Sequence, residues 1–598
     1  MIKEKWTRRV ALLGIVSVGF GACSDNDDSI DDTPVGPGPT TPALAIPTGA
    51  TAQALTNTLG IEVSWDAVQD AEGYLVTLSG GANEIQEVVT EPMVEFTGLA
   101  GRTEFTASII AQAAGRTDSP AATAMATTGS LNEIFFNTAD FNNLVADPGF
   151  DPSVFSAGSR SAPPNFDIAV PAGYTPATLR TDGLVPSVDG RTLQAVNYPG
   201  AIAPGTPLAD QWHFGWTVWD PTGLDSRAAT GLPIVDVATV QTNTTWASDT
   251  IYRLTQPVFV GTDCGADGSA PDCNAVTLTI EPGTTIVGAA NVGVGIRGAY
   301  LIVSRGSRII ADATPGQPLD APRRPTESET IVFTSERPLG SRDREDWGGL
   351  VINGQAPTNA GVDVEGEGDS GLYGGSDVND DSGIIRGVRI EFAGDDVTPT
   401  DQLNGLALQG VGAGTTISYV QIHHNQDDGI EPFGGTASAD HLVLTGIGDD
   451  SVDGTDGYQG FHQFVIIQQR GDRADQGLEI SNNGDTEDAE PRSLAVLANV
   501  TAIGANSAVV SGDIAGSASD NAIQFREGTN YRVFNSIFQG FGESFCIRDA
   551  VSIRNALNRL DGITDPNATL SAEGIILWSN GGADDSPLNF AACGGGSS

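Results

Sequence analysis

The chain has 598 residues and carries 29 lysine and arginine residues against 76 acidic ones, giving a formal net charge of −47. This balance excludes a general nucleic-acid binder, because such proteins need a basic surface to attract phosphate. Hydrophobic residues make up 39% of the chain, so the acidity does not indicate disorder, and the length predicts several domains.

Residues 1–22 have the features of a signal peptide. A positive stretch, MIKEKWTRR, precedes the apolar run VALLGIVSVGF, which is too short to cross a bilayer. The following Phe20-Gly21-Ala22-Cys23 resembles the lipobox of bacterial lipoproteins, with Phe20 in place of the usual leucine. The resemblance implies that Cys23 becomes the first mature residue and carries the acyl chains of a membrane anchor. The alternative is an ordinary secretory signal followed by a chance cysteine.

Residues 23–43 are expected to form a solvated tether, because they are rich in aspartate and proline and poor in apolar residues. Ser24 stands where lipoproteins kept at the inner membrane usually have aspartate, so the resemblance implies the outer membrane. Acidic residues close behind the lipid cysteine also resemble the surface-export signals of some Gram-negative lipoproteins. We therefore expect a lipid-anchored protein on the periplasmic or, preferably, the cell-surface face of the outer membrane.

Residues 44–128 contain short runs that alternate apolar and polar side chains, separated by turns at intervals of about 8–12 residues. This spacing predicts a small β-sandwich. Trp65, Tyr74, Leu99 and the run Phe105–Ala111 resemble a fibronectin type III domain, with Phe105 in place of the tyrosine that the family usually has there.

Residues 129–245 are irregular and rich in proline, glycine and aromatic side chains. Trp212, Trp216 and Trp219 lie within eight residues of one another, and such rings suit stacking on a sugar or another flat ligand. The alternative, which we favour, is a plug that buries its own rings and caps the open end of the following domain.

Residues 246–598 contain pairs of short, β-branched strands that recur about every 22–26 residues in the later part. This repeat predicts a parallel β-helix with a C-terminal tail. The segments EDWGGLVING, SGIIRGVRIEFAG, NQDDGIEPFGG and GDDSVDGTDGYQG resemble right-handed β-helix lipoproteins of Gram-negative bacteria. The sequence thus predicts an all-β chain, a right-handed parallel β-helix preceded by a small fibronectin type III-like sandwich.

Aligning the later repeats places acidic residues at equivalent positions. Strand alternation puts Ile430, Val452, Leu478 and Ile523 inward, so the residues that follow them should stack outward. The aligned positions are Asp428 and Glu431, Asp450 and Asp453, Gln476 and Glu479, and Asn521 and Gln524. Carboxylates about 4.8 Å apart repel by about 3 kcal/mol at an effective dielectric constant near 20, so something must offset this repulsion.

Three explanations remain open for these acids. The first is Ca²⁺ held by Asp428, Glu431, Asp450, Asp453 and Glu479, because this ion prefers several carboxylate oxygens. The second is an outward acidic face screened by solvent and by Arg470, Arg473 and Arg526. The third is raised pKa values that serve acid–base catalysis.

An enzyme of this kind would act on polysaccharide. Asn425-Gln426-Asp427-Asp428 is similar to the paired-aspartate segment of polygalacturonases, although that family's other motifs have no counterpart in the chain. A lyase would instead pair Ca²⁺ with a basic residue such as Arg526. The candidate catalytic residues are therefore Asp427, Asp428, Glu431, Asp453, Glu479 and Arg526, whereas His423, His424 and His462 are interpreted as surface or turn residues.

Five cysteines are present, and Cys23 is assigned to the lipid. Cys264 and Cys273 bracket a polar loop that a disulfide could close, which leaves Cys546 to pair with Cys593. The favoured function is a non-catalytic, Ca²⁺-stabilised binding or adhesive component of the cell surface. A carbohydrate-active enzyme, either a polysaccharide lyase or a glycoside hydrolase, is the alternative, and polysaccharide or an outer-membrane transporter is the expected partner.

Overall fold

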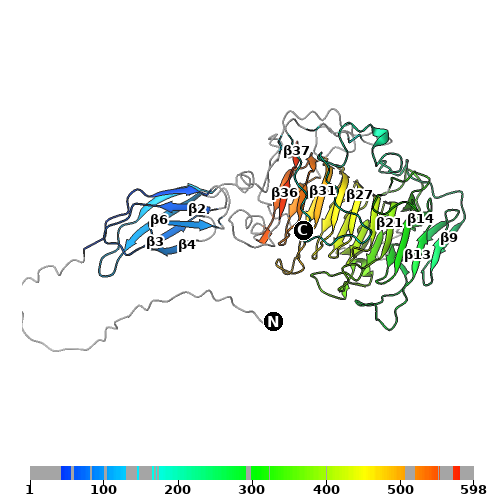
Figure 1. Cartoon of the computed structure of the whole chain (residues 1–598), viewed down its shortest axis with the longest axis horizontal. Coiled ribbons are helices and arrows are strands. Elements are labelled where there is room, and N and C mark those ends of the chain that lie inside the picture. The colour runs from blue at the N-terminus through cyan, green and yellow to red at the C-terminus, as the bar shows by residue number, and fades with distance from the viewer. Residues whose placement is uncertain are drawn as a thin grey trace, which may run out of the picture.

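The structure is a computed structural model of the whole chain (Figure 1). It describes residues 42–55, 60–80, 84–97, 99, 104–128, 145–146, 165–166, 170, 174–290, 298–321, 323–398, 401–505, 519–549, 551–552 and 570–578. The predicted signal peptide, Cys23 and Cys593 lie outside these residues. Within them, no helix is both long and apolar enough to span a membrane.

The first described region is a sandwich of two antiparallel sheets. One sheet has the order β1-β2-β5 and the other the order β4-β3-β6-β7. The strands are β1 (Thr51–Ala54), β2 (Gly60–Ser64), β3 (Gly73–Ser79), β4 (Ile85–Val89), β5 (Met93–Thr97), β6 (Glu104–Gln112) and β7 (Ala122–Thr127). Trp65 and Tyr74 lie in the shared core, 5.1 Å apart and edge to face, and Phe105 is buried beside them. The sequence prediction of a small β-sandwich is confirmed.

The second region is a right-handed parallel β-helix, in which successive strands stack along the coil from β9 to β36 (Figure 1). Nine of the described strands form one sheet. They are β12 (Val258–Val260), β15 (Leu301–Val303), β18 (Leu350–Asn353), β24 (Leu406–Gln409), β26 (Ile430–Phe433), β28 (Val452–Gly454), β30 (Leu478–Ile480), β32 (Asn521–Phe525) and β35 (Glu543–Ile547).

The other coil strands form a bent sheet that supplies the remaining walls. They are β9 (Ile234–Val237), β10 (Thr244–Trp246), β11 (Ile251–Leu254), β13 (Thr277–Ile280), β14 (Thr285–Gly288), β16 (Arg308–Asp312), β17 (Ile331–Ser335), β21 (Gly383–Glu391), β25 (Thr416–His423), β27 (Ser438–Thr445), β29 (Phe461–Gln468), β31 (Val496–Ile503), β33 (Arg532–Phe534), β34 (Ile537–Gln539), β36 (Ser571–Glu573) and β37 (Ile576–Trp578). Two short hairpins, β19 (Val364–Glu365) with β20 (Leu372–Tyr373) and β22 (Asp396–Thr398) with β23 (Asp401–Gln402), and two 3₁₀ turns, η3 (Leu208–Asp210) and η4 (Glu367–Asp369), complete the described elements.

The interior of the coil is a single apolar core. Inward side chains of each repeat stack on those of the next, as in Ile430, Val452, Leu478 and Ile523, which are at most 2% exposed. Both faces of the bent sheet are covered at its centre, because β25, β29 and β31 are buried along their whole length and β27 is buried except at His441.

Residues 174–229, which we call the cover, cross the outer face of the bent sheet. Tyr174 donates a hydrogen bond to the carbonyl of Gly574 near the C-terminal end, and Ser226 bonds to Glu391 much earlier in the coil. The cover therefore lies along the side of the coil and does not plug its end. The strand β8 (Val145–Ala146) instead pairs in parallel with β37, the last strand of the bent sheet.

Candidate functional site

The outward face of the nine-stranded sheet carries the predicted acidic positions in one column. Asp453 pairs with Glu479 and Glu479 with Gln524 in the parallel register, and Ile430 pairs with Val452, which places Glu431 beside Asp453. We call Glu431, Asp453, Glu479 and Gln524 the first column. Its predicted register is confirmed, because strand parity is fixed once the inward residues enter the core.

Glu431 and Gln524 of the first column are buried and Asp453 and Glu479 are half-buried, which was not expected for an outward face. Glu431 and Gln524 are only 6% and 5% exposed. The side-chain amide of Asn404 lies over Glu431 and donates hydrogen bonds to Glu431 Oε2 at 2.6 Å and to Glu367 Oε2 of η4 at 2.7 Å. Solvent therefore does not screen Glu431 and Gln524, because water reaches little of their surface, whereas the part of that explanation that relies on Arg526 agrees with its ion pair to Glu479.

A second column runs beside the first at the turns that lead into the strands, and consists of Asp428, Asp450, Gln476 and Asn521. Each side chain accepts a hydrogen bond from the backbone N–H of the next member: Asp450 to Asp428 at 3.0 Å, Gln476 to Asp450 at 2.6 Å, and Asn521 to Gln476 at 2.9 Å. This structural role was not predicted. In the bonds accepted by Asp428 and Asp450 a single carboxylate oxygen is used, and each carboxylate has a second one.

The residues just before the second column form a third column, Asp427, Asp449 and Asp475, whose side chains are half-buried. Carboxylate oxygens of neighbouring columns converge in four groups, and within each group the atoms lie within 4.8 Å of one another. The groups are Asp427–Asp428–Asp449, Asp428–Glu431–Asp453, Asp449–Asp450–Asp475 and Asp450–Asp453–Glu479. All five residues predicted to bind a metal belong to these groups.

Burial and mutual repulsion favour the protonated acids. Burial, followed by the charges of Asp449 and Asp396, raises the pKa of Asp427 to about 7, and burial with Asp449 and Asp520 raises the pKa of Asp475 to about 6. The pKa values of Glu431 and Asp453 rise well above the usual range for the same two reasons. Without a counter-ion, the folded chain near neutral pH must therefore hold either repelling carboxylates or bound protons.

Arg526 provides a local positive charge at one end of the columns. It donates hydrogen bonds to Glu479 and, at 2.9 Å, to Glu527. Burial still raises the pKa of Glu479, although the attraction of Arg526 opposes the rise. The predicted contact between Arg526 and the acidic residues is confirmed, but one guanidinium cannot balance the whole set.

A buried amide oxygen adds to the oxygen atoms at this site. Asn404 is fully buried, and its Oδ1 has no hydrogen-bond partner among the described residues, whereas its Nδ2 bonds to Glu431 and Glu367. Carboxylate and amide oxygens together are the donors that Ca²⁺ prefers. The residues present therefore fit a hard cation. Asn404 stands two residues before Leu406, at the position that Asp428 holds in the next turn, but the sequence alignment of acidic positions did not include this amide.

The three histidines interpreted as surface or turn residues are buried, so a surface position is wrong for all of them, although His424 does lie in the bend that follows β25. His423 bonds to Thr445 at 2.7 Å and to the carbonyl of Asp220 in the cover at 3.0 Å. His462 points into the core, and burial lowers its pKa to about 4. His424 is also buried, with a pKa lowered well below the usual range by burial and by nearby arginines. The rings are structural because the cover or the coil encloses them.

The three clustered tryptophans lie in the cover. Trp216 and Trp219 are 0% and 7% exposed and pack, with the partly buried Trp212, against outward residues of the bent sheet such as Val443 and Ile466. Their indole nitrogens donate to atoms of the cover itself. The prediction that Trp216 and Trp219 stack on a ligand is wrong, because buried rings have no free face.

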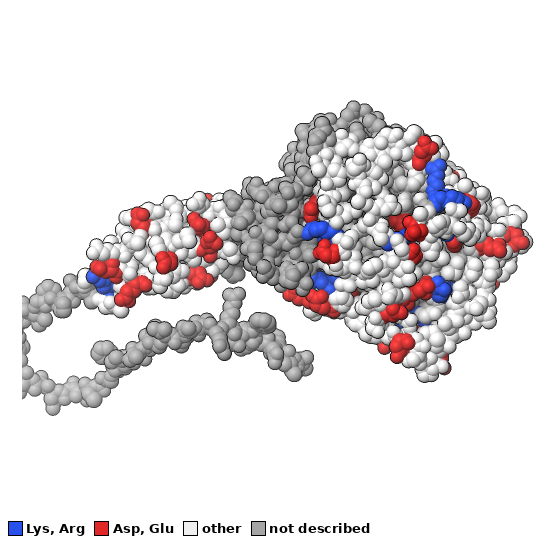
Figure 2. Space-filling model, in the orientation of Figure 1, with Lys and Arg blue, Asp and Glu red and all other residues white. Residues whose placement is uncertain are grey.

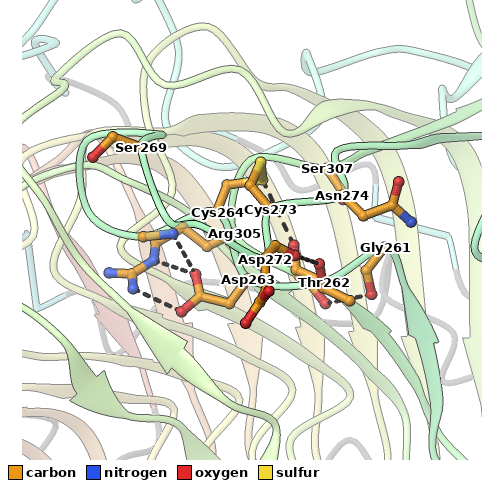
Figure 3. The surroundings of a disulfide bond; sticks show 12 residues. Gly261, Thr262, Asp263, Cys264, Ser269, Asp272, Cys273, Asn274, Arg305 and Ser307 are labelled. Carbon is orange, nitrogen blue, oxygen red and sulfur yellow. Dashed lines mark hydrogen bonds and ion pairs between the residues drawn. A yellow bond between two sulfur atoms is a disulfide. The ribbon is translucent and has the colours of Figure 1, made fainter.

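The disulfide between Cys264 and Cys273 is confirmed and closes a loop beside Asp263 and Arg305 (Figure 3). Arg305 makes a two-point ion pair with Asp263, with N–O distances of 2.8 and 2.9 Å. Cys546 also forms a disulfide, but its predicted partner Cys593 lies outside the described residues, so that pairing stays a prediction.

Surface charge is organised differently from the buried columns. On the face shown in Figure 2, acidic residues and arginines are scattered in small neighbouring groups. Exposed pairs such as Arg323–Glu329 and Arg308–Asp381 explain part of this pattern. The acids of the three columns are instead buried or half-buried.

Together the coil and its columns define a right-handed parallel β-helix with a buried acidic centre on one sheet. The family model described as "Pectate-lyase like beta helix domain" matches residues 238–570, more than half of the chain, and the chain belongs to this family. No curated protein matches the chain.

Several solved structures are similar to a smaller part of the chain. One is a Fn3-like protein from Clostridium thermocellum, with 23% identity over 15% of this chain and 97% of that chain and a TM-score of 0.13. The fn3 domain of the human collagen alpha-1(XX) chain has 20% identity over 16% of this chain and 91% of that chain, with a TM-score of 0.14. The FN5 domain of Drosophila Lar has 20% identity over 14% of this chain and 100% of that chain, with a TM-score of 0.13.

Proposed function

We propose that the protein is a non-catalytic binding or adhesive component of the cell surface, anchored in the outer membrane by a lipid and stabilised by Ca²⁺ in the acidic columns. The observation that carries the Ca²⁺ part is the convergence of buried carboxylates in four adjoining groups. Buried charges of one sign are retained only when a counter-charge, protons or a metal offset them.

Ca²⁺ suits this centre better than protons do for a folded protein at neutral pH. The donor set is made of carboxylates, with the unpaired amide oxygen of Asn404 beside Glu431. Asp453 belongs to two of the four groups, so one side chain bridges neighbouring cation positions. An ion bound there would join successive turns of the coil through their side chains. The carboxylates, which repel one another without the ion, would then each be attracted to it.

Binding can be measured directly by isothermal titration of the chelator-treated protein with Ca²⁺ and Mg²⁺. We expect saturable Ca²⁺ binding and much weaker Mg²⁺ binding, because Mg²⁺ demands a smaller octahedral site and gives up its waters reluctantly. Asp453→Asn should lose most of the Ca²⁺ heat. Asp249→Asn, which removes an exposed carboxylate elsewhere, is the matched control. Absence of Ca²⁺ binding by the unaltered protein would refute the cation.

The membrane anchor rests on the sequence around Cys23. Cys23→Ser should move the protein from the detergent phase to the aqueous phase in phase partitioning, or leave it unprocessed. Protease shaving of intact cells should then distinguish the cell-surface face from the periplasmic one. A neighbouring outer-membrane transporter is the proposed protein partner, and co-purification in mild detergent tests it.

The second candidate is a carbohydrate-active enzyme, which is favoured by the description of the family and by the contact between Arg526 and Glu479. Two observations weigh against it. The acids are buried or half-buried, and within each of the four groups carboxylate oxygens lie within 4.8 Å of one another, too close for a sugar to stand between them. Glycosidases hold their carboxyl groups about 5–9.5 Å apart.

A glycan array with and without Ca²⁺, followed by mass spectrometry of the products, separates the two functions. Retention of an uncleaved glycan supports the binding protein. Released oligosaccharides that disappear in Asp453→Asn would support the enzyme and overturn the non-catalytic proposal.

A further inference from the structure

A cavity of about 460 Å³ lies between the cover and the outer face of the bent sheet. The acidic columns lie on the outer face of the other, nine-stranded sheet. Its walls come from Arg191, Thr192 and Gln194 of the cover, from the loop at Asp320–Ala321, and from β25, β27 and β29. The residues contributed by these strands are Tyr419, Asp440, His441, Phe461 and Gln463. The volume is in the range of small-ligand sites, about 300–1,000 Å³.

His441 is held in one orientation within this wall. Its Nδ1 lies 2.6 Å from Asp440 Oδ1, and its ring is stacked on Tyr419 with centroids 4.4 Å apart and planes 8° apart. Phe464 packs against the ring from the next turn at 5.1 Å. The second nitrogen, Nε2, has no hydrogen-bond partner among the described residues. A ligand in the cavity therefore meets a fixed imidazole edge.

Asp440 is part of a buried ionic network. Burial opposes its ionisation, but the hydrogen bond and charge of His441, the charge of Arg191 and the hydroxyl of Ser418 hold the pKa of Asp440 at about 2. The carboxylate is therefore ionised and accepts a hydrogen bond from an Nδ1–H of His441. A neutral imidazole in this tautomer presents Nε2 as an acceptor, and a protonated one presents it as a donor.

The backbone at this bend makes the ring stack costly. Tyr419, His441 and Phe464 occupy equivalent positions with φ of 52°, 56° and 58°. The same position in other turns holds residues that accept this conformation more easily, namely Gly387, Asn499, Asn535 and Gly574. Left-handed backbone costs other L-residues about 1–2 kcal/mol each. Three rings in succession at such positions therefore indicate a requirement for the rings themselves.

The polar groups of the cavity select the class of ligand. Arg191 uses its donors on Asp189, Asp440 and three backbone carbonyls, so it offers no charge to an incoming anion. At the exposed rim, the hydroxyl of Thr192, the amide of Gln194 and the carboxylate of Asp320 bond to no other side chain or backbone group in the described part. A hydroxyl, an amide and a carboxylate match a neutral, hydroxyl-rich ligand, whereas Asp320 would repel an acidic one.

We propose that this cavity is a second binding site, which takes one or two units of a neutral glycan and uses His441, Gln194 and Asp320 as hydrogen-bonding groups. The site is separate from the acidic columns and does not depend on Ca²⁺. It would allow the coil to hold a neutral polysaccharide on one side while the metal centre stiffens the other.

The test is isothermal titration of the full-length protein with neutral gluco-, galacto- and manno-oligosaccharides of two to four units, and with uronic-acid oligomers of the same lengths. We expect at least one neutral series to bind and the uronic acids to bind at least tenfold more weakly. His441→Phe should weaken binding at least tenfold. That substitution keeps the stack, and Phe464 already occupies the equivalent backbone position in the next turn.

A second variant avoids the buried network. Gln194→Ala changes an exposed rim side chain and should weaken binding severalfold, whereas Gln256→Ala, at an exposed glutamine far along the chain, should not. Neutral glycans that fail to bind, or that bind equally well to His441→Phe and Gln194→Ala, would overturn the proposal. Binding abolished by Asp453→Asn or by chelator alone would place the glycan at the acidic columns and would also overturn it.

Discussion

The outward column of the nine-stranded sheet has two halves that share geometry and differ in chemistry. The early half is apolar and consists of Phe259, Ile302, Val351 and Ala407, and the later half is the first column, beginning at Glu431. The residues of both halves are buried or half-buried, and η4 accepts hydrogen bonds from Tyr300 in the early half and from Asn404, which also bonds to Glu431 of the later half.

The difference shows that the coil determines where an outward side chain lies and how far it is buried, but not whether that side chain is apolar or acidic. The apolar half packs into a small cluster with Tyr300 and Leu403 and gains stability from burial alone. The acidic half loses hydration without gaining apolar contacts, so its stability depends on what neutralises it. The predictions that follow alter one half and use the other as the reference.

Placing a single acid in the apolar half should have the largest effect. Val351 is fully buried, with Ile302 and Ala407 on either side. We expect Val351→Asp to cost more than about 4 kcal/mol in urea unfolding, because one buried carboxylate finds no partner and no shared ion. Val351→Ala, which only removes volume, should cost about 2 kcal/mol. Rescue of Val351→Asp by Ca²⁺ would show that this half also binds cations.

The column ends at Cys546, which pairs with Gln524 in register, and its disulfide should be the next largest contribution. A bond to Cys593 would stabilise the fold by about 4 kcal/mol through the entropy of the unfolded chain. Non-reducing peptide mapping should recover a linked Cys546–Cys593 peptide, and Cys546→Ser with Cys593→Ser should lower stability by that amount. Recovery of Cys593 as a free thiol would contradict the pairing.

Chelation should weaken the acidic half alone. At a hundredfold excess over its dissociation constant, one Ca²⁺ stabilises the folded state by about 2.7 kcal/mol. EDTA should therefore lower the melting temperature, and Ca²⁺ should restore it. Asp453→Asn should remove most of this response, and Asp249→Asn should keep it. NaCl at matched ionic strength serves as the control, because equal shifts from the two salts would indicate general screening.

The smallest expected effect is the dependence of the chelated protein on pH. Asp427 and Asp475 have pKa values raised to about 7 and about 6, so the folded state binds protons that the unfolded state does not. The contribution of these two aspartates to stability should therefore rise by about 1 kcal/mol as pH falls from 8 to 6.5. The buried His213, His423, His424 and His462 have lowered pKa values and bind protons when unfolded. They oppose this rise with and without Ca²⁺, so the aspartate contribution is read as the difference between the chelated and the Ca²⁺-loaded protein. Ca²⁺ should abolish the rise, and denaturation curves across this range would show whether it does.

The sequence alone determined the repeat, the in-and-out alternation and therefore the alignment of Glu431, Asp453 and Glu479. These are consequences of a period of two within each strand and of apolar residues that must face the core. The small sandwich and the Cys264–Cys273 disulfide follow from similarly local patterns.

Only the tertiary structure decided what lies over the coil. Glu367 of η4 shares the side-chain amide of Asn404 with Glu431, and Arg191 meets Asp440 from a position 249 residues away in the chain. The same packing buries His423, which the sequence analysis interpreted as a surface or turn residue, and Trp216, for which it kept stacking on a ligand as one alternative. Neighbouring residues in the sequence decide which side chains of a strand face inward. Burial of the outer face depends instead on distant segments, whose position over the coil no local sequence pattern indicates. The chemistry of the acidic columns arises from the combination of the two.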